Sequence, residues 1–302
     1  MENLRGIGLM VLAMAGFALE DALIKLAAGG LGLGLVVAVF GLGGTAVFAA
    51  LTLAAGQPVL SPHMLTRLTG LRALFEITGR VGYFLAITQA SLSSASVILQ
   101  ATPLVVTLGA VLFMDETVGW RRWGAMAVGF AGVLIVLRPG LEGFTAASLF
   151  AVIGMVGFAG RDLATRAAPV ALSNLQLAFL GFAVLIPTGL GLSLFDEAHR
   201  WPDPGQAGVL GGAVLAGCGA YYALTAAMRL GEVSVVAPFR YTRLVFALAL
   251  AAALFGEAPD GPMLLGAALI VASGIYILIR GRRSGSSSSR DSSAPRAENA
   301  NG

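Results

Sequence analysis

The chain has 302 residues, of which 57% are hydrophobic and only 12% are charged, with a formal net charge of +3. A soluble domain typically carries about 25% charged residues, so this composition excludes a globular protein whose whole surface faces water. The composition is instead typical of an integral membrane protein, for which lipid is the solvent of the outer surface.

Apolar stretches of about 18–25 residues, the length that crosses a ~30 Å hydrocarbon core, follow one another along the chain. They predict ten transmembrane helices, at residues 4–27, 31–55, 67–90, 94–114, 121–138, 145–166, 172–194, 206–228, 234–255 and 262–279. The predicted fold class is therefore all-α, a polytopic membrane protein. No cleavable signal peptide is expected, because Glu20, Asp21 and Lys25 stand where small residues would precede a cleavage site.

Basic residues are distributed unequally between the two ends of the predicted spans. Ten lie on the side of the N-terminus: Arg5, Arg67, Arg72, Arg121, Arg122, Arg166, Arg229, Arg280, Arg282 and Arg283. Three lie on the other side: Lys25, Arg138 and Arg200. Because basic loops stay in the cytoplasm, both termini are predicted to be cytoplasmic in a bacterial-type inner (plasma) membrane. Both termini on one side require an even number of spans, in agreement with ten.

The two halves of the chain resemble each other. The tripeptide Gly-Phe-Ala at 16–18 recurs at 157–159, and Asp21 recurs as Asp162, both at an offset of 141 (157 − 16 and 162 − 21). Each half holds five spans, so the second copy crosses the membrane in the opposite orientation. Inverted repeats can exchange conformations and open a central site to each side in turn. The alternative is that the duplication only enlarged the bundle.

This repeat divides the chain into three parts. We predict a first five-helix repeat at residues 1–141, a second, inverted repeat at 142–283, and a disordered, Ser-rich cytoplasmic tail at 284–302. The tail is too polar to bury a core of its own.

Short fragments in both halves carry a family resemblance. They are Pro103, Glu116, Trp120 to Gly124, Gly129, Gly132-Val133 and Leu137 to Gly140, then Ala237 to Thr242, Phe255 to Glu257, Gly266-Ala267 and Gly274 to Tyr276. In this order and in two copies, they resemble the EamA-type transporters of the drug/metabolite transporter superfamily, over about residues 4–281. The resemblance implies ten helices around a central cavity formed by both repeats. Segments 17–25 and 238–242 are most similar to the branch that contains S-adenosylmethionine and amino-acid metabolite carriers.

Ionisable residues at bilayer depth are the most informative part of the sequence. Each costs about 2.5–3.5 kcal/mol at a helix centre if it faces lipid, so we expect all of them to face inward. They are Glu20, Asp21, Lys25, Glu76, Arg80, Arg161, Asp162, Arg166, Arg240 and Arg243. Three acid–base pairs lie four positions apart, on one helical face, and are expected to touch: Asp21–Lys25, Glu76–Arg80 and Asp162–Arg166.

Six of these residues are bases and four are acids, which leaves an excess of two positive charges. A substrate carboxylate or phosphate can complete the pairing, since the guanidinium group suits bidentate contact with either. Arg80, Arg240 and Arg243 are therefore predicted to bind substrate. The alternative is a closed network in which acids of other helices neutralise all three.

Other residues are candidates for supporting roles. Three tyrosines can offer a ring and a hydroxyl to the substrate, with ordinary packing as the alternative: Tyr83, Tyr222 and Tyr241. Four acids are candidates for carrying a coupling proton or forming a gate, with a purely structural role as the alternative: Glu20, Asp21, Glu76 and Asp162. Pro103 and Pro238 interrupt helical hydrogen bonding and are hinge candidates, although static kinks would look the same. Glu116 is expected to cap the helix that follows it.

These features favour a secondary transporter that moves a small amphipathic metabolite, an amino acid or derivative with an anionic group, by alternating access. The chain has no phosphate-binding loop for ATP and no Cys/His cluster with metal-ligand spacing, so no cofactor or metal is expected. The expected partners are the substrate, the lipid bilayer and a coupling proton, with no nucleic acid. The alternatives are a membrane-embedded enzyme, which would need a nucleophile and base at depth, and a non-transporting scaffold.

Overall fold

The computed structural model describes residues 2–27, 31–89, 98–137, 146–196, 200–255 and 260–291, and these residues contain helices and no strand. The main helices are α1 (Glu2–Ala27), α2 (Leu33–Ala54), α3 (Arg67–Gln89), α5 (Thr102–Phe113), α6 (Trp120–Leu137), α7 (Ala146–Arg166), α8 (Asn174–Ala183), α9 (Leu185–Ser193), α10 (Pro204–Arg229), α11 (Val233–Val236), α12 (Thr242–Phe255) and α13 (Gly261–Asp291). Two short 3-10 helices, η1 (Pro62–Met64) and η2 (Ala237–Tyr241), complete the described elements.

Each of the ten predicted spans falls on helical structure, which confirms the polytopic all-α fold. The seventh span consists of α8 and α9, and the ninth consists of α11, η2 and α12. By length and hydropathy alone, five stretches of the described residues qualify as membrane spans: Glu2–Ile24, Gly34–Ala54, Asn174–Ser193, Pro204–Arg229 and Val233–Leu254. Helices α3 and α7 carry several of the inward-facing charges, which lower their hydropathy.

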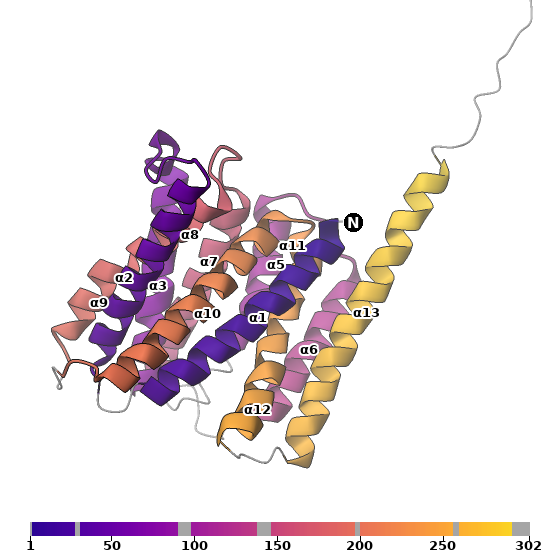
Figure 1. The fold of residues 1–302 in the computed structure, drawn as a ribbon. Coiled ribbons are helices and arrows are strands. Elements are labelled where there is room, and N and C mark those ends of the chain that lie inside the picture. The colour runs from indigo at the N-terminus through magenta and orange to yellow at the C-terminus, as the bar shows by residue number, and fades with distance from the viewer. Residues whose placement is uncertain are drawn as a thin grey trace, which may run out of the picture.

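The packing of the helices is reciprocal between the two repeats (Figure 1). Helix α3 packs on α7, and α1 packs on α10. In both contacts the third helix of one repeat lies against the first helix of the other. In the same way, the contact between α5 and α7 corresponds to the contact between α12 and α1. Helix α2 packs on α8 and α9, and α6 packs on α13, so each of these lies against its own counterpart. This exchange of partners is the pattern of two inverted five-helix repeats around a common centre.

Glycines allow the first and third helices of opposite repeats to approach closely. A Cβ atom on Gly157 of α7 would lie only 2.4 Å from the backbone nitrogen of Gly79 on α3. At the equivalent contact between α1 and α10, a Cβ on Gly16 would lie 2.9 Å from the Cβ of Ala220. The two contacts are equivalent in the two repeats, because their residues differ by the same offset of 141 (157 − 16 and 220 − 79). Small residues at helix crossings of this kind let backbones pack tightly inside a membrane.

Both predicted hinge prolines lie at breaks in helical structure. Pro103 stands in the first turn of α5, and Pro238 stands at the start of η2, which interrupts the ninth span between α11 and α12. Proline has no N–H to donate and so favours such breaks. Movement at these positions stays a prediction.

The N-terminal end of α1 and the C-terminal end of α13 lie at the same end of the bundle (Figure 1), which we call the terminal face. Helix α13 continues to Asp291 and so overlaps the start of the tail predicted at 284–302. Residues 292–302 lie outside the described residues.

Candidate functional site

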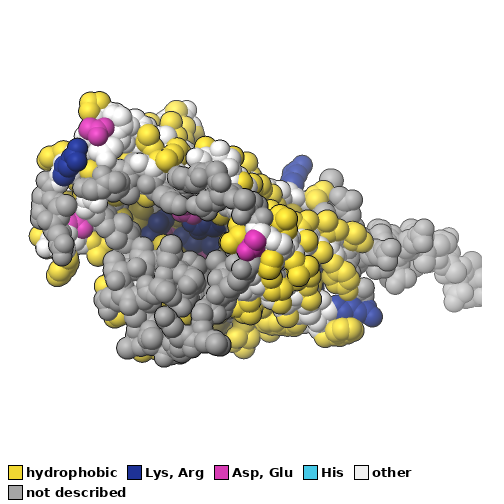
Figure 2. All heavy atoms as spheres, turned by 90° about the horizontal axis from the view of Figure 1, so that it is seen from below, with side chains coloured by type: hydrophobic (Ala, Val, Ile, Leu, Met, Phe, Trp, Pro, Cys, Tyr) yellow, Lys and Arg dark blue, Asp and Glu magenta, His cyan; other side chains and the backbone are white. Residues whose placement is uncertain are grey.

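A cavity of about 270 Å³ lies between α1, α3, α5, α7, α10, η2 and α12, and so receives side chains from both repeats. Its charged lining residues are Glu20, Asp21, Arg80, Arg161, Arg240 and Arg243. Figure 2 views the face opposite the terminal face and shows basic and acidic side chains inside a hollow. The cavity therefore opens on this opposite face, with its charges below the rim.

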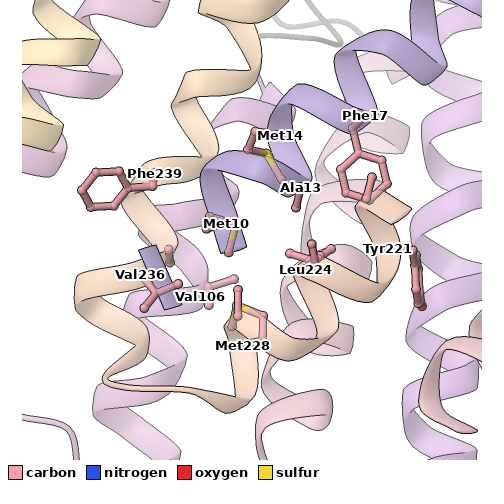
Figure 3. Packing of buried hydrophobic residues seen from close by; sticks show 14 of the residues in the cluster. Met10, Ala13, Met14, Phe17, Val106, Tyr221, Leu224, Met228, Val236 and Phe239 are labelled. Atoms are coloured by element: carbon pink, nitrogen blue, oxygen red, sulfur yellow. The ribbon is translucent and has the colours of Figure 1, made fainter. Parts of the chain in front are cut away.

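Apolar side chains close the cavity toward the terminal face. Met10, Val106, Met228 and Val236 come from four helices and are at most 1% exposed, and Figure 3 shows them converging. Met14, Phe17 and Leu224 belong to the same cluster and also line the cavity. This cluster, which we call the apolar floor, separates the charged cavity from the terminal face.

A polar clamp joins the two repeats between the apolar floor and the terminal face. The carboxylate of Glu116 accepts hydrogen bonds from the backbone nitrogens of Val233 (2.7 Å) and Ser234 (3.0 Å) at the start of α11. Arg122 donates to Glu232 at 2.5 Å and to the hydroxyl of Ser234 at 3.2 Å. The expectation that Glu116 caps the following helix is thus wrong, because the chain folds so that a helix of the other repeat presents its free N–H groups to this carboxylate.

Glu76 is the centre of a buried network on α3. Its side chain is fully buried and contacts Arg80 at 3.5 Å, which confirms the predicted pair, and Arg161 of α7 at 3.4 Å. The hydroxyl of Tyr221 on α10 donates to its Oε2 atom at 2.6 Å. Arg161 also lies over the rings of Phe158 and Tyr221, at 5.2 and 5.7 Å from their centroids. Charged, hydrogen-bonded and cation–π contacts therefore hold one carboxylate between three helices.

Asp162 extends this network to the ninth span. It is 1% exposed, contacts the guanidinium of its neighbour Arg161 at 2.9 Å, and forms an ion pair with Arg240 of η2. The prediction that Asp162 pairs with Arg166 is therefore wrong. Spacing within one helix identifies only same-helix neighbours, whereas Arg240 reaches Asp162 from η2, a distant part of the chain.

The last ion pair lies at the mouth of the cavity. Arg243 of α12 contacts Asp21 of α1 at 2.5 and 3.1 Å, with side chains that are 37% and 53% exposed. Asp21 was expected to pair with Lys25, whose side chain lies outside the described residues. With this pair, Arg80, Arg161, Arg240 and Arg243 each contact a carboxylate. Arg240 and Arg243 contact acids of other helices, as the alternative of a closed network requires, whereas Arg80 contacts an acid of its own helix.

One residue of the network, Arg72, is not among the site residues predicted from the sequence. Arg72 lies within the predicted third span and is counted among the basic residues on the side of the N-terminus, yet it is 2% exposed and donates to the hydroxyls of Tyr221 (3.0 Å) and Thr165 (2.8 Å). The signal was present, because residues 72, 76 and 80 repeat at a spacing of four and lie on one helical face.

The three candidate tyrosines lie in different environments. Tyr83 lines the cavity as expected. Tyr222 is 40% exposed and lies outside the cavity lining, while its neighbour Tyr221 enters the network. Successive residues on a helix point about 100° apart, so choosing the wrong one of two neighbours moves the side chain to another face. Tyr241 is 1% exposed and packs with Val133 and Ile270, also outside the lining.

The sequence matches the model of the EamA-like transporter family twice, at residues 4–138 and at residues 145–280. The chain belongs to this family. As an EamA-like transporter it is a multi-pass membrane protein of the drug/metabolite transporter superfamily, and it is a small-molecule transporter rather than an enzyme. Among the described residues, no group of three or more His, Cys, Asp or Glu side chains is placed to hold a metal ion.

Several curated relatives of this EamA-like transporter are named for small molecules. The chain is 26% identical to an S-adenosylmethionine uptake transporter of Rickettsia felis, over 69% of this chain and 70% of that protein. It is 32% identical to a riboflavin transporter of Rhizobium johnstonii, over 61% of each chain. It is 27% identical to a pseudopaline exporter of Pseudomonas aeruginosa, over 65% of this chain and 69% of that protein.

A protein of known crystal structure has the same fold. It superposes with a TM-score of 0.77 at 21% sequence identity, over 93% of this chain and 98% of that chain.

Proposed function

We propose that this protein is a secondary transporter that moves a small amphipathic metabolite with at least one anionic group across the inner membrane by alternating access. The substrate class that we infer is an amino acid or an amino-acid derivative. The arginine-rich lining of the central cavity is the observation that carries this proposal.

The balance of charge around the cavity favours an anionic group. Five guanidinium groups belong to the network or the lining, those of Arg72, Arg80, Arg161, Arg240 and Arg243, against four acids, Glu20, Asp21, Glu76 and Asp162. Guanidinium groups keep their proton in proteins, so the charge of these groups persists. A carboxylate or phosphate entering the cavity would reduce this excess.

The donors that face the cavity are also placed for a ligand. Arg80 is 21% exposed, and among the described residues it contacts an acid only through Nε, at 3.5 Å. The exposed ion pair of Arg243 and Asp21 lies at the mouth, where an entering carboxylate can exchange with Asp21 at little cost, because exposed ion pairs are weak. The cavity volume of about 270 Å³ lies near the lower end of the range for ligand pockets, which suits a small metabolite.

The two ends of the cavity support alternating access. One end opens on the face opposite the termini, while the apolar floor and the polar clamp close the other end. The basic residues on the terminal face favour a cytoplasmic location for both termini. In this orientation the described conformation is open to the outside and closed to the cytoplasm. The names of the relatives, which cover uptake and export of different small molecules, support a metabolite as cargo.

Thermal-shift measurements on the purified protein test the substrate class. The ligands are amino acids, the corresponding α-carboxamides, and tetraalkylammonium cations. We expect the amino acids to stabilise the protein and the carboxamides and cations to have no effect, because only the amino acids bring an anionic group to the arginines. Stabilisation by carboxamides or cations, with none by the acids, would contradict the proposal.

Two variants sharpen this experiment. Arg243→Gln removes a guanidinium whose ion pair is exposed, so the protein should remain folded while stabilisation by amino acids disappears. Arg5→Gln removes the same charge from an exposed position near the start of α1 and should leave the stabilisation intact. Equal losses in both variants would show that total charge, and not the cavity, determines the response.

A further inference from the structure

The repeat places two equivalent contacts in the core with opposite chemistry. Glu20 of α1 and Gly217 of α10 correspond to Arg161 of α7 and Glu76 of α3, since 161 − 20 and 217 − 76 both equal 141. Arg161 and Glu76 form a buried ion pair at 3.4 Å. At the equivalent contact, a carboxyl group faces a glycine, and a Cβ atom on Gly217 would lie 2.9 Å from the Oε2 atom of Glu20. Glu20 therefore has a glycine opposite it, at the position where Arg161 in the other repeat has an oppositely charged partner.

One oxygen of the Glu20 carboxylate has no compensating contact among the described residues. The side chain of Glu20 is 4% exposed, and its Oε2 atom is buried without a hydrogen-bond partner among the described residues. The phenyl ring of Phe40 also borders the space above Gly217, with its Cζ atom 2.4 Å from the position of a Cβ on this glycine. An ionised carboxylate buried without a partner is strongly disfavoured, and binding of a proton removes the charge.

The charged and titratable groups around Glu20 come from four helices. They are Asp21 of α1, Arg80 of α3, Arg243 of α12 and the thiol of Cys218 on α10. The two bases already contact other acids, Arg80 with Glu76 and Arg243 with Asp21. Among the described residues, Glu20 therefore lacks an arginine partner, and a proton can neutralise its charge.

We propose that Glu20 is the site that binds the coupling proton, and that the protein is a proton–substrate symporter. This inference rests on the transport function proposed above. In the conformation described here, Glu20 lines a cavity that is open to the outside, so its carboxylate can take a proton from water on that side. After the conformational exchange, the carboxyl group returns the proton to water on the other side.

The same geometry couples the proton to the substrate. The positive charges of Arg80 and Arg243 favour the ionised form of Glu20, and an anionic substrate on either arginine weakens that effect. Substrate binding therefore favours protonation, and by reciprocity protonation favours substrate binding. Closure of the cavity around an ionised Glu20 and an anionic substrate together would be costly, so the loaded form closes with Glu20 protonated. In the empty cavity Arg80 and Arg243 offset the charge of Glu20, so the unloaded form can return with this carboxylate ionised.

Infrared difference spectroscopy on the purified full-length protein tests the proton site without any substrate. Transfer from mildly acidic to mildly alkaline buffer should remove a protonated-carboxyl C=O stretching band. The band should be absent in Glu20→Gln and shifted in Glu20→Asp, and it should persist in Cys218→Ser, which changes the neighbouring thiol only. Persistence of the band in Glu20→Gln, or its absence from the wild-type protein, would overturn the proposal.

Uptake of a uniformly labelled amino-acid mixture into proteoliposomes tests the coupling. An imposed gradient, acidic outside by one pH unit, should raise the accumulation of label by the wild type by up to about tenfold, because one unit corresponds to about 1.36 kcal/mol per proton. Glu20→Gln should lose this response and retain more of its exchange of labelled for unlabelled amino acids than of its gradient-driven uptake. Equal loss of both activities in a folded Glu20→Gln protein would contradict a proton site. Absence of uptake by the wild type would refute the proposed substrate class, while the infrared result would still decide the role of Glu20.

Discussion

The buried contact between Glu76 and Arg161 provides the strongest test of the central network. Glu76→Gln removes a fully buried charge that contacts Arg80, Arg161 and the hydroxyl of Tyr221. Removing one partner of a buried ion pair typically costs about 3–5 kcal/mol. Arg161 keeps its contact with Asp162, so we expect a loss near the lower end, about 3 kcal/mol. At about 2 °C per kcal/mol for a large domain, the unfolding temperature should fall by about 6 °C.

The chain contains its own reporter for this measurement. Cys218 is its only cysteine and is 5% exposed, so a thiol-reactive fluorescent dye will report unfolding during a temperature ramp in detergent. Asp21→Asn is the matched control, because it makes the same acid-to-amide change in an exposed ion pair. Such pairs contribute about 0–1 kcal/mol, so the control should shift the unfolding temperature by at most about 2 °C.

The double variant Glu76→Gln/Arg161→Gln completes the cycle. If the two side chains interact as the 3.4 Å contact indicates, the double variant will lose less stability than the sum of the single variants. Equal shifts for Glu76→Gln and Asp21→Asn, or strict additivity in the cycle, would refute the view that the network stabilises the contact between α3 and α7.

Three other predictions follow from separate parts of the fold. Gly157→Ala should lower the unfolding temperature, because its Cβ would lie 2.4 Å from a backbone nitrogen of α3, whereas Gly211→Ala, with open space around it, should not; equal effects would contradict the close crossing. Glu116→Gln should cost about 0.5–2 kcal/mol in the same dye assay, since a charged cap of α11 is lost; an unchanged unfolding temperature would show that the clamp adds no stability. In a cysteine-free background in whole cells, a membrane-impermeant thiol reagent should label Trp201→Cys and not His63→Cys, and the reverse result would invert the proposed topology.

The ion pairs of α1 and α7 show which part of the site could be predicted from the sequence. Asp21 and Asp162 are equivalent by sequence, and both were assigned same-helix partners four positions away. In the structure, each acid pairs with an arginine of the ninth span, Asp21 with Arg243 and Asp162 with Arg240, and for Asp162 this partner replaces the predicted Arg166. The sequence contained all four residues and their depth, but the choice of partner depends on how helices of different repeats pack.

Properties that depend on local chemistry could be predicted from the order of the amino acids. Runs of apolar residues long enough to cross the bilayer placed the spans, and the cost of a charge in lipid required the ionisable residues to face inward. The recurrence at a fixed offset established the inverted repeat, because five spans per copy reverse its direction.

Which inward-facing residues contact one another depends on how the helices pack. Tyr221 and Tyr222 have nearly the same hydropathy surroundings, so no apolar stripe distinguishes their faces, yet one enters the network and the other is exposed. Glu20 was one of four candidate acids, and it became distinct only when Gly217 was found opposite it. In a membrane helix nearly every face is apolar, so sequence periodicity carries little information about rotation, and the contacts between helices determine the site.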